Sequence, residues 1–388
     1  MTTSVLSEEQ EQVKLTAARV AREVYGPHAL EWDQNRTEFP IEERRRLGSL
    51  GMLGISLPEE YGGSGAPILD ALVAIEELAK ICRPAGFQVF ESNTGPAQVV
   101  AQLGSDLLKQ KYLPGIISGD LSMAVAISEP DAGSAATDMT TKAVREGDHY
   151  RVNGAKRWIS NSGHAELYLL YVRLDDAPGS KGIGALVVEK DTDGVSFGVP
   201  EKLMGFRGIP SCDIYFEDVL VPAENLLVGP GDGFRKLFGA FSMERLGNAT
   251  VSLAIAQASL DRSIEYVTTR EQFGKPLIEF QAVQTDLADM VVLVEAARLL
   301  VYRAASEAGT GLPDSLQVSI AKRAANEAGK KVSELAIGLH GGNGYAEEYG
   351  IERLHRDAHG WAIAGGTPTM QRVRIVSELL GRRFDQRS

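Results

Sequence analysis

The sequence contains very little cysteine. Only Cys82 and Cys212 occur among 388 residues, and they lie far apart in the chain. Two distant thiols support neither a disulfide framework nor a cysteine-based metal site, and they fit a reducing compartment. The first residues include Glu8, Glu9 and Glu11 and lack the basic start and apolar run of a signal or transit peptide. We therefore expect a cytoplasmic protein.

Long apolar runs and an excess of basic charge are also missing. No segment approaches the roughly 20 apolar residues that a membrane-crossing helix needs, so we expect no membrane span. The formal net charge is −12. Nucleic acids and anionic membranes require a basic surface that displaces counterions, so we expect neither as the main partner. A bound polyanion would need a local basic or helix-terminal site.

Several common motifs are absent. The sequence has no GxxxxGK[ST] phosphate loop, no HExxH and no Gly-x-Ser-x-Gly elbow. The glycine-rich segment at 62–65 neither follows a predicted strand nor opens a helix, so we interpret it as a loop and not as a dinucleotide fingerprint. His340, His355 and His359 are not spaced as a metal-ligand set with nearby carboxylates. We expect them to be structural or surface groups, and we expect no metal.

The hydrophobic pattern changes its period twice along the chain. Up to about residue 120 apolar residues recur at helical spacing, and Ser7 with Gln10 forms the capping-box pattern of a first helix. Helical patterns also cover residues 69–81 and 96–112. These patterns predict an all-α domain over residues 1–120.

A compact β domain is predicted over residues 121–232. Tyr150 and Val152 alternate with polar neighbours up to Asn153-Gly154, a dipeptide that predicts a tight hairpin turn. Strand-like runs recur after it. Helical spacing then returns and continues, which predicts a helical bundle over residues 233–388. Helices, then strands, then helices without βαβ alternation indicate separate α, β and α domains.

Four conspicuous motifs follow one another along the chain: Ala126 to Ser134, Asn153 to Asn161, Thr269 to Lys275 with Phe280-Gln281, and Gly341 to Tyr345 with Glu348-Tyr349, Arg353 and Arg356-Asp357. Taken alone, the first could be an ordinary Pro- and Gly-rich loop. Together and in this order they resemble the motifs of the acyl-CoA dehydrogenase family.

The resemblance spans essentially the whole chain and implies an α/β/α three-domain fold with a β-barrel-like middle domain and a C-terminal four-helix bundle. It also implies bound FAD, an acyl-CoA substrate, an electron-transfer flavoprotein as electron acceptor, and a homotetramer built as a dimer of dimers.

By position, the resemblance assigns cofactor contacts to two groups of residues. The first group lines the isoalloxazine, and the second reaches the FAD of a neighbouring subunit, where Arg270 can pair with the pyrophosphate. A lone Arg270 could equally be a solvated charge at a helix end. Gly342 and Thr367 complete the expected cofactor set. The first group is Ile127, Ser128, Trp158 and Ser160, and the second is Arg270, Phe273 and Gln281.

The implied reaction needs a carboxylate that removes the α-proton, donors to the thioester carbonyl, and a flavin that accepts the β-hydride. Many family members carry the glutamate in an Ile-Tyr-Glu-Gly-Thr run. Here the corresponding run, residues 363–367, has Gly365 at the glutamate position. A glycine cannot remove a proton, but its backbone N–H could still donate to the substrate carbonyl.

A second glutamate is available on a different predicted helix. Isovaleryl-CoA and long-chain acyl-CoA dehydrogenases place their base in a Glu-Arg pair, which Glu244-Arg245 resembles. Leu237 and Phe241 lie seven and three residues before Glu244, so they place it on the stripe that should face inward. We predict that Glu244 is the catalytic base, with a pKa raised toward the working pH. The alternative is a salt bridge or an exposed edge position.

The resemblance also places Ser134, Arg245 and Gly365 at the substrate. Two other functions stay open: a flavin-dependent oxidase or monooxygenase on the same fold, and an inactive acyl-CoA-binding homologue that lost its base at Gly365. No motif specifies the acyl group, which could be branched, long, cyclic or dicarboxylic. The motifs also do not distinguish a CoA thioester from an acyl-carrier-protein thioester.

Overall fold

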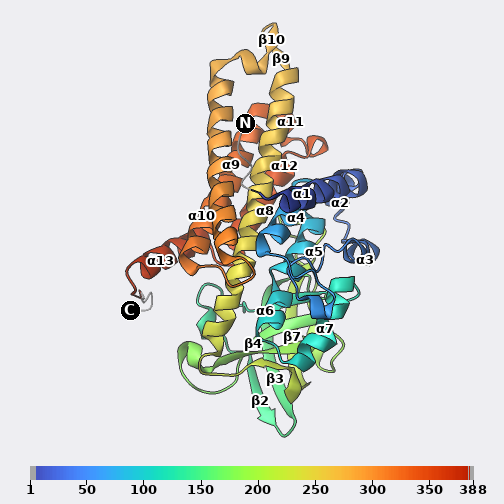
Figure 1. Cartoon of the computed structure of the whole chain (residues 1–388), viewed down its shortest axis with the longest axis vertical. Helices are drawn as coiled ribbons and strands as arrows, with labels where there is room; N and C mark the ends of the chain where they lie inside the picture. The colour runs from blue at the N-terminus through green and yellow to red at the C-terminus, as the bar shows by residue number, and fades with distance from the viewer. Residues whose placement is uncertain (1–5, 383, 385–388) are drawn as a thin grey trace.

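The N-terminal region is helical, as predicted. The computed structural model describes residues 6–382 and 384 (Figure 1). The predicted capping box is confirmed, because Ser7 Oγ accepts from Gln10 N–H while the Gln10 side chain accepts from Ser7 N–H. The helical pattern at 96–112 is two helices, with Ser105 capping the second. The helices are α1 Glu8–Val20, α2 Ala29–Asn35, α3 Ile41–Ser49, α4 Ile68–Ile81, α5 Arg83–Asn93, α6 Pro96–Leu103 and α7 Asp106–Ser118.

The middle region forms one mixed sheet in the order β6-β7-β3-β2-β4-β5-β8, with β1 parallel to β4. No pairing between β6 and β8 closes this path among the described residues. Alternate residues of β4 enter two different cores, so this strand is buried on both faces and its sequence is continuously apolar. The strands are β1 Met123–Ala126, β2 Lys142–Glu146, β3 His149–Ser160, β4 Leu167–Arg173, β5 Ile183–Glu189, β6 Val195–Phe197, β7 Ser211–Pro222 and β8 Leu226–Val228.

The predicted hairpin turn at Asn153-Gly154 is wrong. Strand β3 continues through both residues, and the register against β7 shifts between Val152 and Gly154, as at a β-bulge. Gly154 has φ +142°, and a Cβ there would lie 2.7 Å from the Thr141 Cα. The glycine therefore permits a bulge and a close backbone approach. The hairpin between β2 and β3 turns instead at Gly147, whose φ is +62°.

The C-terminal region is a helical bundle. Figure 1 shows α8, α9 and α10 side by side, with α8 and α9 joined at the tip formed by β9 and β10. Helix α10 packs against α8, α9, α12 and α13. The predicted α/β/α architecture is thus confirmed. The elements are α8 Gly233–Thr269, β9 Glu271–Gln272, β10 Lys275–Pro276, α9 Gln281–Ala308, α10 Ser315–His340, α11 Gly342–Tyr345, α12 Glu352–Ile363 and α13 Pro368–Leu379.

Helix α8 connects two hydrophobic cores. Near its start, Leu237 and Ala240 pack into the core that contains one face of the sheet. From Met243 and Leu246 onward, the buried residues belong to the core shared by the N-terminal helices and the bundle. The junction between the cores therefore falls within one helical turn of Glu244. No helix in the described part of the chain is long and apolar enough to span a membrane.

Candidate active site

Glu244 and Arg245 lie inside the molecule, at the junction of the two cores. Their exposed fractions are 6% and 5%, although both carry charged side chains. Residues of this type are rarely buried unless they are paired or serve a function. The inward position of Glu244 was predicted from the stripe of Leu237 and Phe241, and the burial confirms it.

Gly365 lies directly against the Glu244 carboxyl group. It has φ +67°, a conformation that favours glycine, in the turn between α12 and α13. A Cβ on this glycine would lie 2.9 Å from Glu244 Oε2 and 3.3 Å from Oε1. The carboxyl group therefore occupies the space that a side chain at residue 365 would need. The missing side chain at 365 and the glutamate at 244 belong to one arrangement.

The Glu244 carboxyl group has no direct partner. Oε2 is buried without a hydrogen bond, and no ion pair to this carboxyl is formed within the described residues. Burial raises the pKa of Glu244 to about 7, although the positive charges of Lys322 and Arg245 oppose the shift. The alternative of a salt bridge or an exposed edge position is therefore wrong. A carboxyl group that titrates near neutral pH can accept a proton and release it again.

Arg245 connects α8 to the Gly365 turn. Its Nε donates to the Gly365 carbonyl oxygen at 3.3 Å, and its guanidinium carbon lies 5.2 Å and 5.0 Å from the ring centres of Phe238 and Phe241. Burial, together with the nearby Arg374, lowers the pKa of Arg245 to about 10. Arg245 Nη1 is buried without an acceptor, and so is the hydroxyl of Tyr171 on β4. The site thus offers two buried polar groups with free hydrogen-bonding capacity.

Residues predicted to line the flavin are brought together from two strands. Lys156 Nζ donates to the Ile127 carbonyl at 3.0 Å, and Arg157 N–H donates to the Ser128 carbonyl at 2.9 Å. These bonds hold the segment after β1 beside the end of β3. Trp158, with φ +64°, leaves 53% of its surface exposed.

We call the segment after β1 and the end of β3, which carry these residues, the flavin wall. Its hydroxyl groups are also free to form hydrogen bonds. Ser128 and Ser160 are half-buried, and neither hydroxyl makes a hydrogen bond within the described residues. An exposed indole beside two free hydroxyls suits a flat, polar ring system, because aromatic faces stack and hydroxyls donate or accept. The residues present therefore fit an isoalloxazine.

A saturated ion pair supports this wall from behind. The Glu129 carboxylate accepts from Thr140 N–H at 2.6 Å, Thr140 Oγ1 at 2.9 Å, Thr141 N–H at 2.9 Å and Lys156 Nζ at 2.9 Å. Burial alone would raise the pKa of Glu129, but the charge of Lys156 and these hydrogen bonds lower it to about 2. The pair fixes both segments of the wall.

The second group of predicted cofactor residues lies elsewhere in the same chain. Arg270, Phe273 and Gln281 are exposed around the tip formed by β9 and β10, and Phe273 is 95% exposed. Figure 1 places this tip and strands β2 and β3 at opposite ends of the molecule. Within one chain, these residues therefore do not meet the flavin wall, and their contact with a neighbouring subunit's cofactor stays a prediction.

Three further predicted residues lie outside the Glu244 cluster. Gly342 opens α11 and is exposed, and Ser134 is exposed in the loop after β1. Thr367 caps α13, where its Oγ1 accepts from Met370 N–H at 3.3 Å. None of the three bonds to Glu244 or Arg245. Among the described residues, no group of three or more His, Cys, Asp or Glu side chains is arranged to hold a metal ion.

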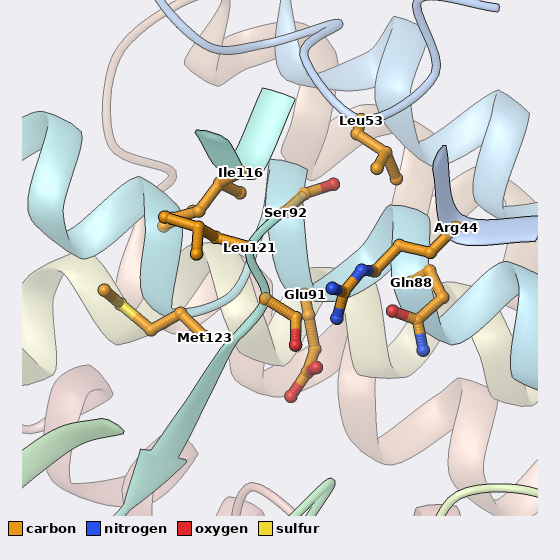
Figure 2. Close-up of a pocket in the computed structure, with 10 residues that line it drawn as sticks. Arg44, Leu53, Gln88, Glu91, Ser92, Ile116, Leu121 and Met123 are labelled. Atoms are coloured by element: carbon orange, nitrogen blue, oxygen red, sulfur yellow. The ribbon is translucent and has the colours of Figure 1, made fainter. Parts of the chain in front are cut away.

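A small cavity of about 10 Å³ lies between the N-terminal helices and the start of β1. Figure 2 shows Arg44, Gln88 and Glu91 pointing into it. Burial raises the pKa of Glu91 well above its ordinary value, and the nearby Glu244 raises it further, while Asn161 donates to Glu91 Oε2 at 3.5 Å. Glu244 does not line this cavity, so we assign the cavity no role in the chemistry.

The sequence reasoning missed a buried polar cluster beside the site. Lys322 on α10, with Asn326 one turn later, meets Asn248, which follows Glu244 by one turn on α8. A lysine within the Ala-rich stripe of α10 was the available signal. Periodicity identifies such a face, but it does not show which helix covers it.

Comparisons with known proteins follow the same division of the chain. Models of the acyl-CoA dehydrogenase N-terminal, middle and C-terminal domains match residues 7–120, 124–219 and 231–380. A 3-sulfinopropanoyl-CoA desulfinase of Paraburkholderia xenovorans is 38% identical over 387 residues, covering 98% of each chain. A glutaryl-CoA dehydrogenase of Desulfococcus multivorans is 38% identical over 381 residues, covering 97% of each chain. The structure of butyryl-CoA dehydrogenase from Megasphaera elsdenii has a TM-score of 0.94 at 35% identity, covering 98% of this chain and 100% of that chain.

Proposed function

The chain belongs to the acyl-CoA dehydrogenase family, and from this premise we propose that Glu244 is the base of its reaction. The enzyme catalyses the FAD-dependent α,β-dehydrogenation of an acyl-CoA thioester to the 2-enoyl-CoA. The single observation that carries the proposal is the buried, unpartnered Glu244 carboxyl against Gly365. The carboxyl fills the space that a side chain at residue 365 would need, and its pKa, raised by burial to about 7, suits proton exchange near neutral pH.

Glu244, Gly365 and Arg245 have different roles in the removal of the α-proton. Glu244 takes up the α-proton. The Gly365 N–H donates no hydrogen bond within the described residues, so it is free to donate to the thioester carbonyl. Arg245 holds the Gly365 carbonyl and thereby the turn that presents this N–H. Burial excludes water from the carboxyl and strengthens each of these interactions.

FAD, when bound, supplies the acceptor for the hydride that leaves the β-carbon. We propose that Trp158 covers the ring, while Ser128, Ser160 and the backbone at Ile127 direct its polar edge. The free hydroxyls and the exposed indole support this assignment. In the same proposal, Thr367 and Gly342 contact the cofactor, and Ser134 contacts the CoA portion of the substrate.

The assembly is part of this proposal. We propose a homotetramer, a dimer of dimers, in which Arg270, Phe273 and Gln281 reach the cofactor of a neighbouring subunit. The tip formed by β9 and β10 supports it, because an almost fully exposed Phe273 is costly in water unless a partner covers it. We further propose a cytoplasmic location and an electron-transfer flavoprotein as the electron acceptor. The two free, buried thiols, Cys82 and Cys212, fit that location.

The test is anaerobic mixing of the flavin-loaded enzyme with acyl-CoAs while the flavin absorbance is followed. The panel contains straight, branched, dicarboxylic and cyclic acyl groups and 3-sulfinopropanoyl-CoA, and sulfite release is measured with the last. We expect one class to bleach the flavin of the wild type, and Glu244→Gln to bleach it at least about 100-fold more slowly. Glu77→Gln is the matched control, because Glu77 is also buried but pairs with Lys80 on α4.

Equal bleaching rates for the wild type and Glu244→Gln would sink the assignment of the base. Sulfite release without bleaching would show that the chain shares the desulfinase activity of its relative. Rapid reaction of the reduced flavin with oxygen would favour the oxidase alternative, and tight binding without bleaching would favour the inactive homologue. The comparisons give neither of these last two alternatives support.

A further inference from the structure

Lys322 is a fully buried cation one layer behind the proposed base. Its Nζ donates to Asn248 Oδ1 at 2.8 Å, to Asn326 Oδ1 at 2.9 Å and to the Ala364 carbonyl at 2.9 Å. Three acceptors match the three N–H groups of an ammonium, whereas a neutral amine has only two. The three acceptors therefore match a protonated lysine and favour it against burial, which lowers the pKa of Lys322 to about 7.

Gly365 separates this ammonium from the Glu244 carboxyl. The Cβ position of Gly365 lies 3.4 Å from Lys322 Cε and 2.9 Å from Glu244 Oε2. No direct ion pair joins the two side chains, because the ammonium donates its hydrogen bonds to amide and carbonyl oxygens. Its charge therefore acts on the carboxyl through space, across a residue that has no side chain to intervene. At this depth the interaction is screened far less than at the surface.

The other groups around Glu244 do not replace this charge. Arg245 precedes it as a neighbour on α8 but points its Nε to the Gly365 carbonyl. Burial raises the pKa of Tyr171 on β4 and of Glu91 on α5, and the charge of Glu244 raises both further, so neither group supplies a positive charge. Arg374 on α13 is half-buried and acts on Arg245. Of the two cations that favour the ionised Glu244, Lys322 has the larger influence.

The same ammonium also fixes the turn. Asn248 Nδ2 donates to the Ala364 carbonyl at 3.4 Å, and Asn326 Nδ2 donates to Ser252 Oγ at 2.7 Å. Lys322 and Asn248 therefore hold the Ala364 carbonyl between α10 and α8, and Asn326 in turn holds Lys322. Because Ala364 precedes Gly365, these hydrogen bonds set the direction of the peptide N–H that faces the substrate carbonyl.

We propose that Lys322 is a positioning residue of the dehydrogenation, whose ammonium keeps Glu244 ionised across Gly365 and fixes the adjacent backbone N–H through Ala364. The inference rests on Glu244 being the base. The sign of the expected effect follows from the charge: without the ammonium, Glu244 holds its proton to higher pH. Because only the carboxylate can accept the α-proton, the acid limb of the kcat/KM profile then moves to higher pH.

The experiment compares pH profiles of kcat/KM for the flavin-loaded wild type, Lys322→Gln and Lys322→Arg. We expect the acid limb of Lys322→Gln to move up by about one pH unit or more, which lowers kcat/KM about 5-fold or more at the pH of the wild-type midpoint. Lys322→Arg keeps the charge and keeps the limb near its wild-type position. A Lys322→Gln profile that is lower at every pH but has an unmoved limb would overturn the proposal, because it indicates a packing role only.

A second measurement does not depend on turnover or on a variant of Lys322. Infrared spectra of the wild type, recorded against pH, follow the protonated carboxyl band that Glu244→Gln removes. The proposal requires this band to disappear by about pH 8. Its persistence there would overturn the inference even if Lys322→Gln does not fold. If Glu244→Gln retains full flavin bleaching, the proposed base fails; if it loses bleaching while the Lys322 tests fail, only the present inference falls.

Discussion

Two buried Glu–Lys arrangements in this molecule contain the same residue types and behave in opposite ways. Behind the flavin wall, the Lys156 ammonium bonds directly to Glu129, which also accepts from Thr140 and Thr141. At the proposed base, the Lys322 ammonium bonds to two asparagines and a carbonyl, and Glu244 Oε2 accepts no hydrogen bond from the described residues. The pKa of Glu129 falls to about 2, while that of Glu244 rises.

The difference shows that a neighbouring cation does not decide what a buried carboxylate does. At Glu129 the directly bonded Lys156 ammonium has the largest lowering influence on the pKa, and the hydrogen bonds to the carboxylate add to it, so this group is no longer basic. A cation that is close to a carboxyl group but not bonded to it favours ionisation of that group and leaves its oxygens free. Glu244 therefore stays available for a substrate proton, and Glu129 does not.

The largest effect is expected when the unpartnered Glu244 carboxyl is removed. Glu244→Gln should lower kcat by about 10²–10⁴-fold, because the base is lost. The free energy of unfolding should stay the same or rise, since an unsatisfied buried carboxyl is replaced by a neutral amide. Steady-state turnover and urea unfolding measure the two quantities. A large loss of stability that accompanies the loss of activity would contradict the comparison.

The saturated pair should give the opposite result. Glu129→Gln leaves Lys156 buried without its counter-charge, so we expect the free energy of unfolding to fall by about 3 kcal/mol. Flavin retention should weaken with it, because the wall loses its support. The exposed pair of Glu146 and Arg151 provides the control: Glu146→Gln should leave the free energy of unfolding nearly unchanged. Unchanged stability in Glu129→Gln would remove the structural role of this pair.

A methyl group added at residue 365 tests the contact between the base and the turn. In Gly365→Ala, the Cβ meets Glu244 Oε2 at 2.9 Å and the backbone is held at a positive φ. We expect kcat/KM to fall about 10- to 100-fold, because the carboxyl must rotate away from the reacting atoms. Gly360→Ala on α12 is the matched control, since a Cβ there meets nothing within 4 Å. Equal activity in both variants would show that the turn does not constrain Glu244.

The smallest expected effect is the pH dependence of stability. Glu129 has a lowered pKa, so its contribution is present above about pH 4.5 and is lost as the pH falls toward 2. Glu244 has a raised pKa, so the folded state binds its proton more tightly, and its contribution is lost as the pH rises from about 4.5 to 7. From about pH 6 to about pH 7 alone, the wild type should lose on the order of 1 kcal/mol relative to Glu244→Gln in urea unfolding. Parallel curves would contradict the raised pKa.

Much of the fold followed from periodicity, and the exceptions have physical reasons. The capping box at Ser7 and the long helical stripes are local patterns, so the chain sequence contains the information that forms them. Asn153-Gly154 was misread because a glycine that permits a bulge and a close approach to Thr141 has the same sequence signature as one in a turn. Only the neighbouring strand distinguishes the two cases.

The site was predictable on one side only. The spacing of the apolar residues of α8 predicted that Glu244 faces inward, because the faces of a single helix follow from its own sequence. The contact between Lys322 and Asn248 could not be predicted in this way, because it depends on how α10 packs against α8. The roles proposed for Arg270 and Phe273 involve a second subunit. Neither the sequence pattern nor the structure of one subunit contains that contact.

The contact between Gly365 and Glu244 also restricts how this site could have arisen by mutation. A carboxylate in the present orientation and a side chain at 365 exclude each other, because a Cβ at 365 would already lie 2.9 Å from the carboxylate oxygen. An ancestor with a larger residue at 365 could have carried glutamate at 244 only with its carboxylate turned elsewhere, because this carboxylate is the movable end of a side chain. The present orientation of the carboxylate therefore became accessible only once residue 365 was glycine.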